Sequence, residues 1–192
     1  MDDKKQAILK HALKLVPFDG WSEYTLSEAA RQAGVPEQEL KKLFPAGVRD
    51  CVTFLLETQN DELAQAMQHE KLETLRVPDR IEKIILARLE KWQSMREVIR
   101  RTVSFNALPW NSMAACKGLY DVVDLIWRLA GDKSTDFNFY TKRMTLSAVY
   151  SSTVLFWLND DSEQHEETVQ FLKRRLNDVA AFGRFTNKFK RA

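Results

Sequence analysis

The stretch Leu26-Ser27-Glu28-Ala29-Ala30-Arg31-Gln32-Ala33-Gly34-Val35 decides the fold, because it predicts a short helix that stops abruptly. Thr25 precedes the stretch and Glu28 follows three residues later, which resembles a capping box at a helix start. Gly34 can adopt the positive φ that closes a helix at its C-terminus. The stretch therefore predicts a helix from about Thr25 to Arg31 and then a tight turn.

Short helices on both sides of this stretch complete a three-helix pattern. Apolar residues recur at helical spacing over residues 7–16, and Pro17 ends that run. After the turn, Pro36 suits the first turn of a further helix at residues 37–43. We therefore predict a unit of helix-turn-helix type over residues 1–46.

The rest of the chain also has helical periodicity. Alternating strand patterns are absent, and long amphipathic segments follow at residues 48–73, 78–101, 113–129, 135–158 and 162–182. The main irregular link is residues 102–111, which contains Pro109. We expect an all-α protein with a C-terminal helical domain over residues 47–182 and a basic aromatic tail over residues 183–192.

Composition excludes several classes of protein. With 192 residues and 44% hydrophobic residues, the chain can bury a substantial core. A net charge of +2 gives no overall argument for nucleic acid. The two cysteines form no CxxC pattern, which favours a reducing compartment. Because no targeting segment and no run of about 18 apolar residues is present, we expect an intracellular protein that is at most peripheral to a membrane.

The segment at residues 37–43 is a poor candidate for reading DNA. A recognition helix presents small polar and basic residues to base edges and phosphates. Here Glu37 and Glu39 lie near the helix start and would repel a polyanion, although Lys41 and Lys42 follow. We expect a helix-turn-helix that is kept as a packing scaffold, without specific DNA binding.

No catalytic or metal-binding spacing is present in the sequence. The histidines lie on different predicted helices and outside any HExxH or ExxH pattern: His11, His69 and His165. Glycine-rich phosphate loops and a GxSxG turn are missing as well. Asp121 and Asp124 share a helix face, for which a solvated surface is a simpler explanation than an acid–base pair. We therefore expect no metal, no cofactor and no enzymatic activity.

Large apolar side chains are concentrated in the middle of the chain, where four of the five tryptophans lie. Such residues build the core of a helical bundle, but Met and Trp also line apolar ligand sites between helices. The candidates for lining a lipid-sized cavity are Trp92, Met95, Ile99, Phe105, Leu108, Trp110, Trp127, Met144, Phe156 and Trp157.

The last segment interleaves aromatic and basic residues. Its phenylalanines fall on one helical stripe, and each neighbouring cation adds about 1 kcal/mol of attraction to an anionic bilayer. The segment predicts weak, reversible membrane contact, and a basic tail without this role is the alternative. The candidate contacts are Phe182, Phe185, Lys188, Phe189, Lys190 and Arg191.

The junction Gly131-Asp132-Lys133-Ser134-Thr135-Asp136-Phe137-Asn138-Phe139-Tyr140-Thr141-Lys142-Arg143 joins two predicted helices. Its glycine can end the first helix, and Ser134 or Thr135 can cap the second. Residues on a helix are about 100° apart, so the aromatic residues near the start of the second helix cannot all face one core. At least one of them is expected to point outward, where it either packs under a loop or forms a docking surface: Phe137, Phe139 or Tyr140.

Residues 26–35, followed by Leu40, Leu43 and Phe44, resemble the N-terminal domain of TetR-type repressors. In that family an all-helical C-terminal domain carries a ligand cavity and the dimer interface. The resemblance implies a TetR-like architecture whose C-terminal bundle holds an apolar cavity. It leaves a ligand-responsive transcriptional regulator that binds DNA as the alternative function.

A second resemblance covers about the whole chain. The junction at residues 131–143 is similar to the hallmark of the Coq-nine family, the lipid-binding accessory proteins of ubiquinone biosynthesis. Residues 16–21, 124–130 and 171–178 are similar to that family in residue type and order. The resemblance implies a TetR-like fold without repressor activity. It also implies a non-catalytic protein that binds isoprenoid quinone intermediates and presents them to the di-iron demethoxyubiquinone hydroxylase.

The same resemblance implies partners and a location. By position, the hydroxylase-binding residues are Ile126, Phe139 and Tyr140, and family members carry Met and Trp at the first two positions. The lipid is an isoprenoid or a phospholipid, and the protein is expected to be a homodimer. Without a transit peptide the chain fits a bacterial member, in the cytoplasm and peripherally associated with the inner membrane, whereas eukaryotic relatives lie in the mitochondrial matrix.

Overall fold

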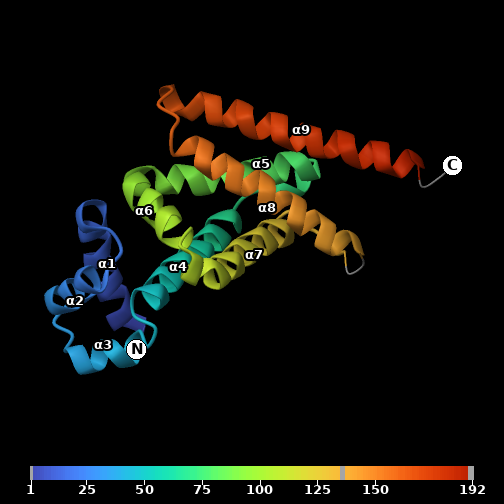
Figure 1. Cartoon of the computed structure of the whole chain (residues 1–192). Helices are drawn as coiled ribbons and strands as arrows, with labels where there is room; N and C mark the ends of the chain where they lie inside the picture. The colour runs from blue at the N-terminus through green and yellow to red at the C-terminus, as the bar shows by residue number, and fades with distance from the viewer. Residues whose placement is uncertain (1, 135–136, 190–192) are drawn as a thin grey trace. The chain divides into compact units, whose positions relative to one another are not determined.

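The computed structural model describes residues 2–134 and 137–189, with the side chains of residues 137, 138 and 182–189 left aside. The described residues form helices and no strand, which confirms the all-α prediction (Figure 1). The α-helices are α1 (Asp2–Asp19), α2 (Glu23–Gln32), α3 (Glu37–Leu43), α4 (Val48–Met67), α5 (Val77–Trp92), α6 (Arg96–Asn106), α7 (Ser112–Leu129), α8 (Phe137–Trp157) and α9 (Glu166–Phe189). Single 3₁₀ turns lie between them: η1 (Leu72–Thr74), η2 (Gln93–Met95), η3 (Pro109–Asn111) and η4 (Glu163–His165).

Helix α2 begins earlier than its sequence predicts. Ser22 is the N-cap, and its hydroxyl accepts a hydrogen bond from the backbone N–H of Thr25 at 3.1 Å. The prediction that Thr25 caps this helix is wrong, because Thr25 is buried and donates its hydroxyl to the carbonyl of Gly20. Glu28 does not reach back to the helix start but accepts hydrogen bonds from Nε and Nη2 of Arg31.

The predicted turn after α2 is confirmed. Gly34 has a φ of 70°, and its N–H donates to the carbonyl of Arg31. The next N–H, of Val35, donates to the carbonyl of Ala30 at 2.9 Å, so the free carbonyls of the last helical turn are satisfied. The third helix has the predicted bounds, with Pro36 as its N-cap rather than inside its first turn.

Two predicted long helices are interrupted. The segment at residues 48–73 ends as α4 at Met67, and the segment at residues 78–101 is divided after Trp92 by η2. The expected link at residues 102–111 is shortened to residues 107–111, since α6 continues to Asn106. Amphipathic spacing persists across the break after Trp92, where Met95 and Ile99 follow at helical spacing, so periodicity alone did not reveal η2. After Met67 the spacing stops, because the positions three and four residues later are Glu70 and Lys71.

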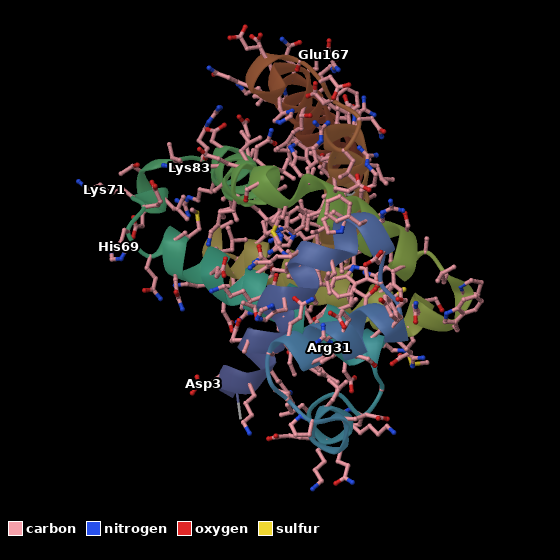
Figure 2. All side chains as sticks on the ribbon, turned by 90° about the vertical axis from the view of Figure 1, so that its left-hand side faces the viewer. Asp3, Arg31, His69, Lys71, Lys83 and Glu167 are labelled. Carbon is pink, nitrogen blue, oxygen red and sulfur yellow. The ribbon has the colours of Figure 1, made fainter. Side chains whose placement is uncertain are left out.

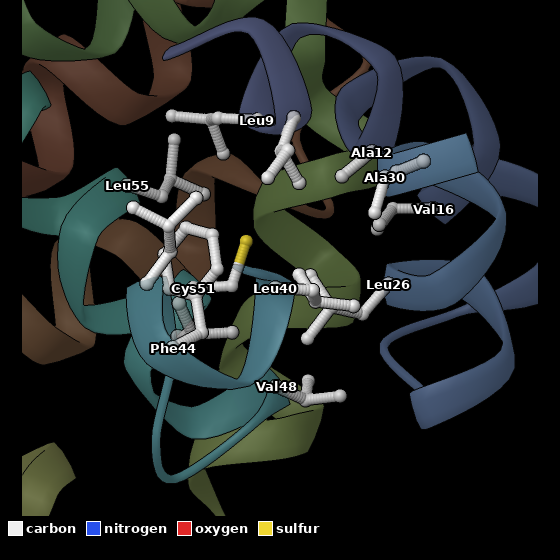
Figure 3. Packing of buried hydrophobic residues seen from close by; sticks show 14 of the residues in the cluster. Leu9, Ala12, Val16, Leu26, Ala30, Leu40, Phe44, Val48, Cys51 and Leu55 are labelled. Carbon is white, nitrogen blue, oxygen red and sulfur yellow. The ribbon is translucent and has the colours of Figure 1, made fainter. Parts of the chain in front are cut away.

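The chain packs as two units, residues 1–62 with 92–118, and residues 63–91 with 119–192. In the first unit, apolar side chains of α1, α2, α3 and α4 meet around Leu9, Leu40, Cys51 and Leu55 (Figure 3). In the second unit, α8 and α9 lie side by side (Figure 1), and Lys173 of α9 lies 3.6 Å from Glu82 of α5. The division into domains at residues 46 and 182 remains a prediction. The two packing units have different boundaries, after residues 62, 91 and 118.

Candidate docking surface at the α7–α8 junction

The turn after α7 depends on a glycine. Gly131 has a φ of 87°, as the sequence predicts. Its N–H donates to the carbonyl of Arg128 at 3.0 Å, and the N–H of Asp132 donates to the carbonyl of Trp127 at 2.9 Å. The guanidinium of Arg80 donates to the carbonyl of Ala130 at 3.0 Å, and a Cβ at position 131 would lie 3.1 Å from its Nη1. The chain reversal between α7 and α8 is thus fixed by backbone and side-chain hydrogen bonds together.

Asp132, directly after this glycine, is the centre of a polar cluster. One carboxylate oxygen accepts from the ammonium of Lys142 at 2.7 Å and from the hydroxyl of Ser134, and the other accepts from Nη1 of Arg143 at 3.2 Å. Burial raises the pKa of Asp132, but the hydrogen bonds from Lys142, Ser134 and Arg143 outweigh it and lower the pKa from 3.8 to about 2. The carboxylate is therefore charged at neutral pH and ties the loop to α8.

Two aromatic rings lie beside this cluster on the first turn of α8. Tyr140 is 66% exposed, and the partly buried ring of Phe139 meets it edge to face, with 5.2 Å between the ring centroids. The guanidinium of Arg143 lies 3.4 Å from the centroid of the Phe139 ring. The expectation that at least one aromatic of the junction points outward is met by Tyr140, whereas the side chain of Phe137 is outside the described residues.

Ile126, the third residue carried over as a partner contact, lies on α7 and is fully buried. In this conformation its side chain can influence a docked partner only through packing beneath the surface. Its neighbour in sequence, Trp127, is partly buried and donates its indole N–H to the carbonyl of Lys142 at 3.2 Å. The ammonium of Lys142 lies 5.4 Å from the Trp127 ring. These contacts join α7 to α8 below the aromatic pair.

The candidate cavity residues fall in both packing units, Trp92 to Trp110 in the first and Trp127 to Trp157 in the second. Three of them are core residues: Trp92, Ile99 and Trp157. Five others are partly buried: Met95, Phe105, Leu108, Trp127 and Phe156. The last two, Trp110 and Met144, are 68% and 75% exposed. The set thus contains core and surface positions, and lipid binding by its members remains a prediction.

Four of the predicted membrane contacts, Phe182 to Phe189, fall within the bounds of the last helix. The backbone of α9 is helical to Phe189, beyond the predicted end at residue 182. The side chains of Phe182, Phe185, Lys188 and Phe189, and the whole of Lys190 and Arg191, are outside the described residues. No helix of the described part of the chain is long and apolar enough to span a bilayer.

Three cations of the helix-turn-helix unit are paired with carboxylates. Lys41 lies 2.7 Å from Glu37 on the exposed face of α3, and Lys4 of α1 lies 2.6 Å from Glu39. On α2, Arg31 pairs with Glu28 at 2.7 Å. Ion pairs leave less positive potential for phosphates than the count of basic residues suggests.

Titratable side chains of the described residues are scattered or held in ion pairs. Among these, no group of three or more His, Cys, Asp or Glu side chains is placed to hold a metal ion. His69, for example, is exposed after the end of α4 (Figure 2). Asp124 does not lie on a solvated face, since it binds Arg143 at 2.7 Å and Arg128 at 3.0 Å. Burial and the nearby charge of Asp50 raise the pKa of Cys51 to about 12, which makes it a poor nucleophile at neutral pH.

The structural role of Arg143 was missed by sequence reasoning. The sequence did indicate that Arg143 could contact Phe139, because residues four positions apart meet on the surface of a helix. The carboxylate that anchors Arg143 was not predictable, since Asp124 lies 19 residues earlier and on another helix.

Comparison with known proteins identifies the family. A family model described as COQ9 matches residues 112–183. The chain is 30% identical to the ubiquinone biosynthesis protein coq9, mitochondrial, of Schizosaccharomyces pombe (strain 972 / ATCC 24843), over 96% of this chain and 73% of that protein. The chain belongs to the COQ9 family. It is also 32% identical to the human COQ9 protein, named mitochondrial, over 95% of this chain but 59% of the human protein, so it spans about three fifths of that relative.

Solved structures with a similar fold are TetR-family proteins. The TetR transcriptional regulator from Nitrosomonas europaea ATCC 19718 matches with a TM-score of 0.73 and 21% identity, over 93% of this chain and 99% of that chain. A TetR transcriptional regulator from Rhodococcus sp. RHA1 matches with a TM-score of 0.63 and 12% identity, over 94% and 97%. At these identities the likeness concerns the fold, and a COQ9-family chain with a TetR-like fold agrees with both resemblances.

Proposed function

We propose that this COQ9-family protein serves ubiquinone biosynthesis without catalysing a reaction itself. In this proposal it binds an isoprenoid quinone intermediate or a phospholipid and presents the intermediate to the di-iron demethoxyubiquinone hydroxylase. The names of its relatives, ubiquinone biosynthesis proteins, support the pathway. The observation that carries the docking step is the exposed ring of Tyr140, held against Phe139 at the start of α8.

The junction has the properties of a docking surface. Aromatic side chains with few rotatable bonds lose little entropy on binding, and they are enriched where a few residues carry most of the binding energy. Tyr140 offers such a ring together with a hydroxyl, and Phe139 supports it from the side. Ile126 contributes from within the core, so its replacement is expected to act by shifting α7 against α8.

A lipid pocket explains why such a protein assists an enzyme. A polyprenyl chain is expensive to expose to water, at about 0.8 kcal/mol for each CH₂ group, so an apolar pocket offsets much of the cost of lifting it from a bilayer. Buried and partly buried tryptophan and phenylalanine residues such as Trp157 and Phe156 are the candidates for its lining. Catalysis then stays with the hydroxylase, and this chain contributes position.

Access to the bilayer is proposed for the C-terminal end of α9. Its phenylalanines and cations favour shallow, reversible contact with anionic lipids. We propose a homodimer that associates peripherally with the inner membrane of a bacterium. Liposome co-sedimentation of the full chain and of a chain truncated before Phe182, with anionic and with neutral vesicles, measures this contact. Equal binding of both chains would assign the contact to another surface.

Bound lipid is the direct test of the proposal. We expect native mass spectrometry of the purified protein, under conditions that keep bound lipids in place, to find an isoprenoid or phospholipid in stoichiometric amount. The matched control is the same preparation after extraction with organic solvent, whose mass must fall by that of the ligand. A preparation that carries neither class of lipid would refute lipid binding by this protein.

The regulator and enzyme alternatives are tested separately. The ion pairs at Glu37, Glu39 and Glu28 support a helix-turn-helix unit that does not bind DNA specifically. A shift assay against the region upstream of the protein's own gene is expected to show only salt-sensitive binding that competitor DNA removes. Nanomolar, competitor-resistant binding would favour a regulator, and a stoichiometric metal found by elemental analysis would favour an enzyme.

A further inference from the structure

Arg143 is a buried charge whose presence calls for an explanation. Its side chain is 6% exposed, in the second turn of α8. Nε donates to Asp124 at 2.7 Å, and Nη1 donates to Asp132 at 3.2 Å, so the guanidinium bridges carboxylates from α7 and from the loop after it. Apolar residues of similar volume often stabilise a protein as well as a buried ion pair does. Stability alone therefore does not account for an arginine here.

The same guanidinium holds Phe139 in two ways. Its central carbon lies 3.4 Å from the centroid of the Phe139 ring, and Nη1 donates to the Phe139 carbonyl at 3.3 Å. A planar guanidinium can stack on a ring and hydrogen-bond in its own plane at the same time, which the ammonium of a lysine cannot do. One side chain thus contacts both the carbonyl and the ring of Phe139, and the helix's own backbone hydrogen bonds do not supply the ring contact.

Phe139 in turn sets the place of Tyr140. Their rings meet at 77° with 5.2 Å between centroids, and Tyr140 is 66% exposed. Both residues lie in the first turn of α8, where backbone N–H groups lack partners within the helix and the chain tends to fray. An exposed ring at a fraying helix end needs a support if it is to keep one orientation.

We propose that Arg143 is the positioning residue of this surface: it locks Phe139, and through Phe139 it holds Tyr140 ready for a partner protein. Asp124 and Asp132 fix the guanidinium, and Lys142 fixes Asp132 from the other side at 2.7 Å. The proposal rests on the proposed docking of the hydroxylase at this pair. It adds that affinity depends on a buried residue that the partner does not touch.

The test compares two arginines that bind the same carboxylate. Arg143→Lys keeps the charge but loses the stacked plane, whereas the control Arg128→Lys changes an arginine that also pairs with Asp124 but is 64% exposed. By titration calorimetry with the purified hydroxylase, we expect Arg143→Lys to weaken binding roughly 3- to 10-fold, the cost of ordering released side chains. Arg128→Lys is expected to leave binding unchanged.

A double-mutant cycle separates positioning from general destabilisation. If Arg143 acts through Phe139, then Arg143→Lys costs nothing further in a Phe139→Leu background. Additive losses would overturn the proposal. Should Arg143→Lys fail to fold, Asp132→Asn removes one anchor of the guanidinium and is expected to weaken binding in the same direction, and an unchanged affinity would count against the proposal.

A spectroscopic measurement on the free protein needs no partner. With fluorotyrosine in place of the four tyrosines, the ¹⁹F signal of Tyr140 is assigned by its loss in Tyr140→Phe. We expect Arg143→Lys to shift this signal toward that of the free amino acid and Arg128→Lys to leave it in place. An unmoved signal in Arg143→Lys refutes positioning. A wild-type protein that does not bind the hydroxylase refutes the proposed function instead, and the ¹⁹F result still decides the role of Arg143.

Discussion

Replacing Tyr140 by alanine should weaken docking without unfolding the protein. Tyr140 is 66% exposed, and a tyrosine side chain has a surface of about 200 Å². A partner that covers the whole exposed part therefore removes roughly 130 Å² from water. At about 25 cal/mol per Å², this area corresponds to about 3 kcal/mol of binding free energy. Since about 1.4 kcal/mol is a tenfold change, the dissociation constant is expected to rise up to about 100-fold. The free energy of unfolding should change by less than about 0.5 kcal/mol, because the ring is exposed in the free protein.

The assay is titration of the hydroxylase against Tyr140→Ala, with Tyr24→Ala as the matched control. Tyr24 is the same residue type and is 71% exposed, but it lies on α2, far in sequence from the junction. Binding that Tyr24→Ala reduces as much as Tyr140→Ala would show a general effect of surface tyrosines. A loss of helical content in Tyr140→Ala would show that the ring belongs to the core, and the reasoning from exposure would then be refuted.

Three further predictions concern stability. In urea unfolding, Gly131→Ala is expected to lower the free energy of unfolding by more than the ~1–2 kcal/mol that a positive φ costs an alanine, because the new Cβ also meets Arg80. The control Gly20→Ala has a φ of 67° and open space around its Cβ, so it should lose only the cost of the positive φ. The pKa of Asp132 is lowered to about 2, so its contribution to stability is complete above pH 3.8 and is lost as the pH falls toward about 2. The free energy of unfolding of Asp132→Asn should therefore fall less than that of the wild type over this pH range. Trp157→Ala, at a side chain that is 1% exposed, should cost about 3–5 kcal/mol in the same measurement, and a smaller loss would mean that the site collapses around the cavity.

Much of the fold could be predicted because its determinants are local. Gly34 and the spacing of Leu40 and Leu43 define the turn and α3, and both have the predicted bounds. The break after Trp92 was not predictable in the same way, because the apolar spacing continues through Met95 to Ile99 on its far side. The end of α4 at Met67 left a signal in the sequence, since Glu70 and Lys71 interrupt the apolar spacing there.

The candidate site was predictable in part. Helix geometry requires that the aromatic residues at the start of α8 diverge, and Tyr140 does point outward. Ile126 lies on the apolar face of α7, since Val122 and Val123, four and three residues earlier, are buried as well, so spacing within the helix already favoured a core position. Spacing did not reveal the role of Asp124, whose carboxylate looks solvated on its own helix and anchors Arg143 of another helix.

A TetR-like fold can carry a function other than DNA binding because different residues decide fold and function. The helix-turn-helix unit is built by buried apolar residues such as Leu26, Leu40 and Leu43, whose roles do not involve the surface. Binding to DNA depends on cations on the surface, and two of those on the surface of this unit, Lys41 and Arg31, are paired within their own helices. Exchanging exposed residues of such a unit can therefore weaken binding to DNA at almost no cost to the core. At the α7–α8 junction, by contrast, surface and interior are coupled, because the exposed ring of Tyr140 depends on the buried ion pairs of Arg143. A change of this surface must therefore also change the ion pairs beneath it.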